Sequence, residues 1–125
     1  MSQNRMYING EWVEASDGAR IDIINPATEE KIDSIPVATA IDLDHALDGA
    51  EQAWRRWQKT DAWTRSAKIR TIANLIRERA KDIALVMTEE QGKPIAEATG
   101  EVNAAADQFD WFADEARRIY GRVID

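Results

Sequence analysis

The chain has 125 residues, 31% of them charged, a net charge of −7, one histidine and no cysteine. The missing cysteines exclude a disulfide scaffold, a thiolate metal site and a cysteine nucleophile, and a single histidine excludes the usual zinc sites. The acidic balance argues against nucleic acid and anionic membrane surfaces as partners, because both attract Lys and Arg.

The first 38 residues predict short strands joined by turns. Asn9-Gly10 separates two apolar segments, residues 6–8 and 12–13, and this pair favours a two-residue hairpin turn. A second turn is expected at residues 16–18, and the alternation at residues 21–23 is typical of a half-buried strand. Pro26 ends that strand, and Pro36 makes residues 35–37 a candidate edge strand.

Residues 39–121 predict helices. Thr39 and Asp42 have the spacing of a capping box, with Asp in place of Glu, at the start of the first helix. The apolar positions between residues 69 and 87 predict either one helix or two helices with a break at residues 79–82. Gly92 and Pro94 predict a stop and a new start, and Gly121 is expected to end the last helix.

The last helix has an apolar stripe that permits two interpretations. Its positions recur at steps of three and four, which is typical of a coiled-coil seam that binds a partner helix. The same pattern is typical of a core helix packed within its own protein, and the abundance of alanine favours this interpretation. The stripe consists of Ile95, Ala98, Val102, Ala105, Phe109, Phe112, Ala116 and Ile119.

Acidic clusters on the helices are candidate metal or acid–base sites. Asp42, Asp44, His45 and Asp48 do not share one helix face, and first-turn acids also stabilise a helix N-terminus, so helix stabilisation is the simpler interpretation. Glu97 and Glu101 lie four apart and could act as a carboxylate pair. A solvated face near the positive end of the helix, where negative charge is favourable, is the preferred interpretation.

A longer acidic stripe follows at Asp107, Asp110 and Asp114, with Arg118 in place to pair with Asp114 at i,i+4. It is most simply a solvated face. The basic stretch at residues 65–81 is expected to form salt bridges with acidic neighbours rather than to bind nucleic acid. Lys93 lacks the rest of a phosphate-binding loop, and no dinucleotide-binding glycine motif occurs. No apolar run reaches the roughly 20 residues of a membrane span, and no secretory signal is present, so the cytoplasm is the expected location.

Several ordered segments resemble the opening of the NAD(P)-dependent aldehyde dehydrogenases. They are residues 7–12 (YINGEW), 24–28 (INPAT), 90–98 (EQGKPIAEA) with 101–102 (EV), 111–113 (WFA) and 119–121 (IYG). The resemblance runs in register from about residue 7 to residue 125 and is nearest to the succinate-semialdehyde and related semialdehyde dehydrogenases. It implies an α+β fragment, residues 1–125, that is normally the outer, N-terminal part of the α/β, Rossmann-like cofactor domain.

The resemblance also implies which parts are missing. In the family order the nucleophilic cysteine, the glutamate that activates water, the oxyanion-binding asparagine and the cofactor loop all lie beyond residue 125. NAD or NADP and an aldehyde would therefore bind the complete protein, expected to be a homodimer or homotetramer, and no catalytic or cofactor-binding residue is expected in this chain. The resemblance implies one ligand role, a structural monovalent cation held by the backbone oxygen of Ile24 and the carboxylate of Glu101.

Two hypotheses follow. The chain is an enzyme fragment that is inert alone, or it is a stand-alone helical interaction module that uses the last helix and the tryptophans. Helices that normally cover a larger sheet leave apolar faces in water, so we expect marginal stability or association for the isolated chain.

Overall fold

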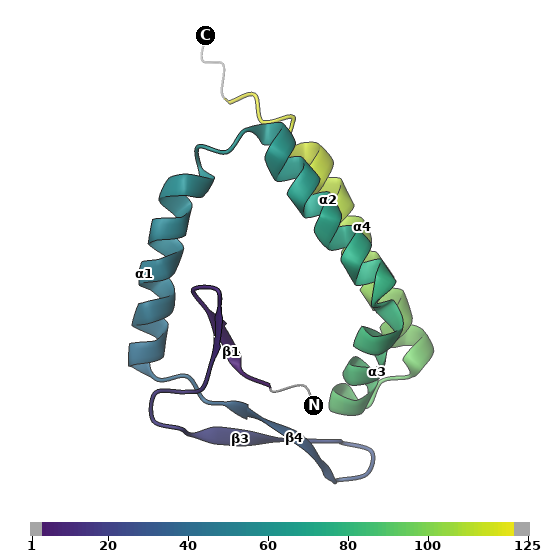
Figure 1. Cartoon of the computed structure of the whole chain (residues 1–125). Coiled ribbons are helices and arrows are strands. Elements are labelled where there is room, and N and C mark those ends of the chain that lie inside the picture. Colours follow the sequence, from purple (N-terminus) through teal and green to yellow (C-terminus); the bar gives the residue numbers. More distant parts are fainter. Residues whose placement is uncertain (1–3, 122–125) are drawn as a thin grey trace. The chain divides into compact units, whose positions relative to one another are not determined.

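The computed structural model describes residues 4–121 and contains two small antiparallel sheets followed by four helices within that range (Figure 1). This confirms the predicted class of fold. The described residues divide into two compact units: the first holds the strands, the first helix and residues 89–91, and the second holds the remaining helical residues. The elements are β1 (Met6–Ile8), β2 (Glu11–Val13), β3 (Arg20–Ile24), β4 (Lys31–Pro36), α1 (Ala40–Trp57), α2 (Ala62–Glu78), α3 (Ala80–Gln91) and α4 (Ile95–Glu115).

The predicted hairpin joins β1 and β2. Asn9 and Gly10 both have positive φ angles, 54° and 91°, as a tight two-residue turn requires. The turn places Tyr7 opposite Trp12, and their ring centroids lie 4.9 Å apart. This aromatic pair stabilises a ladder of only three residue pairs.

The second sheet pairs β3 with β4, which begins earlier than the predicted segment 35–37 and ends at Pro36. Arg20 on β3 connects this sheet to the segments that flank the first one. Its guanidinium donates to the carbonyl oxygens of Ser34, at 2.6 Å, and Asn4, at 3.0 Å, and forms a salt bridge with Glu14. Two-stranded sheets are marginal in water, so such cross-links matter to the first unit.

The hairpin turn also contacts α1. The Asn9 side-chain amide donates to the carbonyl oxygen of His45 at 3.2 Å. Gly49 permits this approach, because a Cβ atom built there would lie 1.5 Å from Asn9 Oδ1. The glycine in the middle of α1 therefore makes room for the hairpin.

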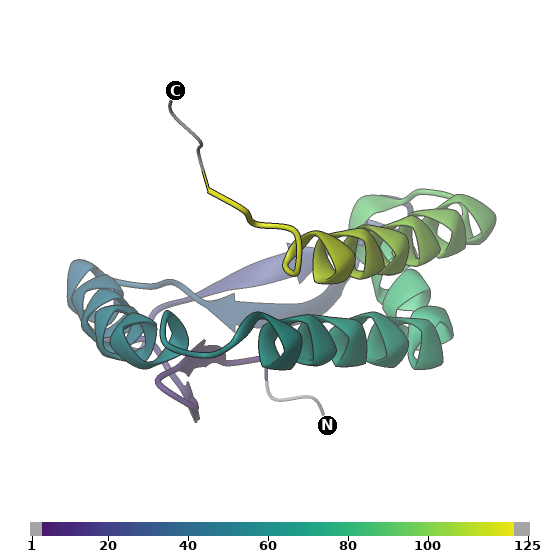
Figure 2. The same cartoon turned by 90° about the horizontal axis from the view of Figure 1, so that it is seen from above.

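In the second unit, α2 and α4 pack side by side through small side chains (Figure 2). Four of their six buried residues are alanines, and no side chain larger than valine is fully buried in the described part of the chain. α3 adds Ala84 to a cluster with Ala98 and Val102, and Ile76, Ile83 and Met87 pack around it. The buried residues are Ser66 and Ala73 on α2, Ala84 on α3, and Ala98, Val102, Ala106 and Ala113 on α4.

The predicted stripe and the predicted end of the last helix need correction. Ala105 is exposed and its neighbour Ala106 is fully buried, while Phe112 is 59% exposed. The buried face is therefore rotated from the predicted one. α4 ends at Glu115 rather than near Gly121, because the amides of Arg117 and Arg118 donate to carbonyl groups only three residues back, which tightens and closes the last turn. The predicted break near Arg79 is confirmed, since α2 ends at Glu78.

Ion pairs between α2 and α4 accompany this face of contact. Arg70 pairs with Asp110 and Asp114, at 3.3 and 2.6 Å, and Arg77 pairs with Asp107 and Asp110, at 2.6 and 2.7 Å. Because residue numbers rise on one helix as they fall on the other, the helices are antiparallel. The acidic stripe is thus an inter-helix contact rather than only a solvated face, and the predicted salt bridges of the basic stretch are confirmed.

The predicted pair between Asp114 and Arg118 is wrong. Asp114 pairs with Arg70 and Arg117, and Arg118 pairs with Glu115 at 3.2 Å. The physical reason is that α4 ends at Glu115, so Arg118 lies beyond the helix and i,i+4 spacing does not place it beside Asp114. A guanidinium from the neighbouring helix reaches this carboxylate as well.

The tight contact between the helices leads to a first prediction. Ala106→Leu should lower the free energy of unfolding by about 1–3 kcal/mol, because extra methylene groups do not fit a packed small-residue contact. Ala105→Leu is the matched control, because the side chain of Ala105 is exposed on the same helix. Urea unfolding followed by circular dichroism measures both, and equal effects of the two substitutions would contradict the packing described here.

Candidate functional site

Of the four residues in the first acidic cluster, Asp42 has a structural position at the start of α1. It is 7% exposed, and its carboxylate accepts hydrogen bonds from the Thr39 amide at 2.8 Å and the Thr39 hydroxyl at 2.9 Å. The Asp42 amide in turn donates to Thr39 Oγ1, so the predicted capping box is confirmed. Ser16 adds its own amide at 3.2 Å, which ties the turn after β2 to the helix.

These hydrogen bonds lower the pKa of Asp42. The largest contribution is the Thr39 amide, and burial acts in the opposite direction. His45, by contrast, is an exposed helix residue. Asp42 therefore serves the helix N-terminus, as the simpler interpretation predicted.

A second prediction follows for pH dependence. Because the folded pKa of Asp42 lies below its unfolded value of about 3.9, the carboxylate stabilises the fold above that pH. This stabilisation is lost as the pH falls through the lowered pKa. Asp42→Asn should remove it, so the stability difference between wild type and variant should shrink between pH 5 and the acid limit. A difference that stays constant over this range, measured by urea unfolding, would contradict this role.

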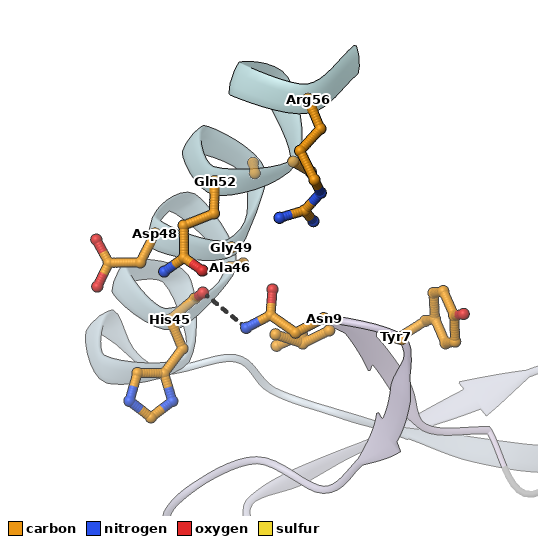
Figure 3. A pocket seen from close by; sticks show the side chains of 12 residues that line it. Tyr7, Asn9, His45, Ala46, Asp48, Gly49, Gln52 and Arg56 are labelled. Carbon is orange, nitrogen blue, oxygen red and sulfur yellow. Dashed lines mark hydrogen bonds between the residues drawn. The ribbon is translucent and has the colours of Figure 1, made fainter. Parts of the chain in front are cut away.

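An open cavity of about 690 Å³ lies in the first unit, between the hairpin turn and α1 (Figure 3). Residues 7–10 form one wall, and α1 contributes residues from His45 to Arg56. Arg56 extends over the hairpin turn, whereas Asp48 points away from the space. The sequence gives no sign of this cavity, because the hairpin and the helix meet across 36 positions of the chain.

The cavity has polar groups but no catalytic arrangement. None of the described carboxylates lies within salt-bridge distance of the Arg56 guanidinium, and Asn9 and Gln52 add side-chain amides. Such groups can orient a small polar molecule. The lining lacks a nucleophile with an adjacent base, which covalent catalysis requires.

The predicted cation ligands lie in different units, Ile24 in the first and Glu101 in the second. Ile24 ends β3 at an irregularity of the strand pairing. The following loop closes on Asn25, whose amide donates to the Glu30 carbonyl at 2.9 Å and whose carbonyl accepts from the Glu29 amide at 2.8 Å. This loop fixes the backbone just beyond Ile24.

Glu101 on α4 has a partner that the sequence did not reveal. Its Oε2 atom lies 2.6 Å from Nζ of Lys93, in the segment before the helix. Glu97 is exposed on the first turn of the same helix. The ammonium group of Lys93 thus contacts the carboxylate that the family resemblance assigns as a ligand of a cation.

Residues 4–121 contain neither a metal-binding cluster nor a membrane-spanning helix. No group of three or more His, Cys, Asp or Glu side chains there is arranged to hold a metal ion. No helix in this range combines the length and apolar character needed to cross a membrane.

Comparison with known proteins identifies the family. The sequence profile described as "Aldehyde dehydrogenase family" matches residues 12–125. A glutarate-semialdehyde dehydrogenase of Pseudomonas putida and an NADP-dependent succinate-semialdehyde dehydrogenase of Escherichia coli are each 44% identical to the chain over 122 residues. Each match covers 98% of this chain and 25% of the relative.

Solved structures of similar enzymes support the same family assignment. An NADP-dependent enzyme of E. coli superposes with a TM-score of 0.95 at 43% identity, over 98% of this chain and 25% of that one. A betaine aldehyde dehydrogenase of Staphylococcus aureus, in complex with NAD+, gives a TM-score of 0.93 at 34% identity, with the same coverage. The chain therefore spans about a quarter of the length of these relatives, and it belongs to the aldehyde dehydrogenase family.

Proposed function

We propose that this chain is the N-terminal part of the cofactor-binding domain of a semialdehyde dehydrogenase. The complete enzyme would oxidise an aldehyde, such as succinate semialdehyde or glutarate semialdehyde, to the carboxylate with NAD or NADP. The main support is the 44% identity to enzymes named for these two substrates, over 98% of the chain. The complete enzyme would be a cytoplasmic homodimer or homotetramer, a proposal that rests on the family resemblance.

The chain alone is proposed to be inert. It contains no cysteine, and the family resemblance assigns the nucleophile to a cysteine. The described residues contribute scaffold: packed helices, a capped helix start and hairpins. The cavity beside Arg56 has polar groups but no nucleophile–base pair, which agrees with this role.

The alternative, a stand-alone interaction module, has less support. It requires the stripe of α4 to be free for a partner helix. Two residues of that stripe are already buried within the second unit, Ala98 and Val102, and so is Ala113 beside it. The exposed aromatic side chains remain in its favour, and a compact, cooperatively unfolding homo-oligomer of the isolated chain would support it.

A chimaera provides the third prediction. The purified chain should not reduce NAD+ or NADP+ with either semialdehyde, measured by absorbance of the reduced cofactor. A chimaera in which this chain replaces the matching quarter of the E. coli succinate-semialdehyde dehydrogenase should turn over, because the missing groups are then supplied. Turnover by the chain alone would refute inertness. A folded chimaera without activity, beside an active E. coli parent, would count against the proposed role.

We further propose that the backbone oxygen of Ile24 and the carboxylate of Glu101 contribute to a monovalent cation site only in the complete protein. Hard oxygen donors suit such an ion. The carboxylate of Glu101 has two oxygens, of which Oε2 contacts the Lys93 ammonium at 2.6 Å. One carbonyl and one carboxylate should not bind the ion alone.

The fourth prediction concerns this cation. Replacing choline chloride by potassium or sodium chloride at equal ionic strength should leave the melting temperature of the isolated chain unchanged and raise that of the chimaera. Glu101→Gln should abolish the rise, whereas Glu97→Gln, on the same helix, should preserve it. A rise that persists in Glu101→Gln would exclude this carboxylate as a ligand.

A further inference from the structure

The Asn9-Gly10 turn has a chemical reactivity that the proposed function does not use. An asparagine followed by glycine is prone to spontaneous deamidation, because glycine has no Cβ atom to hinder the approach of its own amide nitrogen to the asparagine side chain. Glycine follows only Asn9 among the five asparagines, which are Asn4, Asn9, Asn25, Asn74 and Asn103. The sequence therefore singles out Asn9 as the most reactive amide of the chain.

The reaction needs only solvent water as a co-reactant. The amide nitrogen of Gly10 attacks Cγ of Asn9 and forms a new N–C bond. The bond between Cγ and Nδ2 breaks, and Nδ2 leaves as ammonia together with the amide proton of Gly10. Water then opens the resulting succinimide ring at either carbonyl group. The product is aspartate, or isoaspartate, in which the main chain runs through the former side chain.

The hairpin holds Asn9 in a conformation that does not react. Asn9 and Gly10 have φ angles of 54° and 91°, both in the left-handed region. In this backbone conformation Cβ of Asn9 and the nitrogen of Gly10 lie on opposite sides of the bond between Cα and C. Ring closure requires them on the same side, so the turn must open before the succinimide can form.

Contact with α1 keeps the turn closed. Nδ2 of Asn9, the atom that the reaction expels, donates to the carbonyl oxygen of His45 at 3.2 Å (Figure 3). Gly49 lies against the same carboxamide: a Cβ atom built there would be 1.5 Å from Oδ1 and 2.8 Å from Nδ2 of Asn9. These residues all belong to the first unit, so the contact does not depend on the position of the second.

We propose that Asn9 is a site of spontaneous deamidation and that its contact with His45 and Gly49 sets the rate. An aspartate at this position cannot donate to the carbonyl oxygen of His45, because its carboxylate has no hydrogen at neutral pH. An isoaspartate adds one main-chain atom to the turn that pairs Ile8 with Glu11. Either product removes the contact that restrained the reaction, so the modification releases the hairpin from α1.

The test measures deamidation of the chain by mass spectrometry of its peptides during incubation at neutral pH. Gly49→Ala should accelerate the reaction at Asn9 about fivefold, because loss of one hydrogen bond raises the open population by about this factor. Gly100→Ala is the matched control. Gly100 is also in the interior of a helix, and a Cβ atom built there meets nothing within 4 Å, so this substitution changes helix propensity alike and should leave the rate unchanged.

Unfolding supplies the reference rate. In guanidinium chloride the wild-type chain and both variants should deamidate at Asn9 equally and faster than when folded, and Asn103, which precedes alanine, should react more slowly. Equal rates at Asn9 in folded wild type and folded Gly49→Ala would overturn the proposal. So would equal rates in the folded and unfolded wild-type chain. If circular dichroism shows the isolated chain to be unfolded without denaturant, the same comparison is made in the chimaera described above.

Hydrogen exchange tests the consequence of the modification. In chain that has been incubated until Asn9 is deamidated, the amides of residues 6–13 should exchange faster than in fresh chain. The amides of α2, which lie in the second unit, should exchange at the same rate in both. Unchanged exchange in residues 6–13 after complete deamidation would overturn the proposed release of the hairpin.

Discussion

The close approach of α2, α3 and α4 through alanine side chains is the contact on which the second unit depends. Ala73, Ala84, Ala98 and Ala106 are completely buried, and each presents a single methyl group to its neighbours. Small side chains allow helix backbones to approach, but they bury little apolar area for each contact. The ion pairs of Arg70 and Arg77 with aspartates of α4 link the two helices beside this contact.

The large apolar side chains of the protein have the opposite distribution. They lie on the sheets, along α1 and on the outer side of α4, where Phe112 and Ile95 are exposed. A protein of this composition would normally place leucine, isoleucine and phenylalanine in its core. The chain spans a quarter of its relatives, and this inverted pattern is what a part of a larger core would show.

Local signals in the sequence predicted local structure well. Asn9-Gly10 and the capping box of Thr39 and Asp42 succeeded because each depends on a few neighbouring residues and one hydrogen-bond pattern. The prediction failed for Ala105 and Ala106, because the face that is buried depends on contacts with other helices, which spacing along one helix does not reveal. The pairing of Asp114 with Arg70, 44 positions away, is equally invisible to spacing rules.

The candidate sites also divide into those that local sequence signals predicted and those that depend on contacts between distant residues. The structural role of Asp42 followed from helix chemistry, whereas the contact of Lys93 with Glu101 spans a turn whose geometry the sequence does not determine. As ligands of a cation, Ile24 and Glu101 follow from the family resemblance alone. The cavity beside Arg56 required the folded contact between hairpin and helix, so no residue pattern pointed to it.

The positions of the tryptophans make the protein a spectroscopic reporter of its own surroundings. All five are exposed, on β2, α1, α2 and α4, and Trp63 has the guanidinium of Arg117 5.0 Å from its ring centroid. Indole rings in water emit at longer wavelength than rings in an apolar environment. Any macromolecule that covers these faces should therefore shift the intrinsic fluorescence to the blue without an added dye, and single tryptophan replacements would map which face it covers.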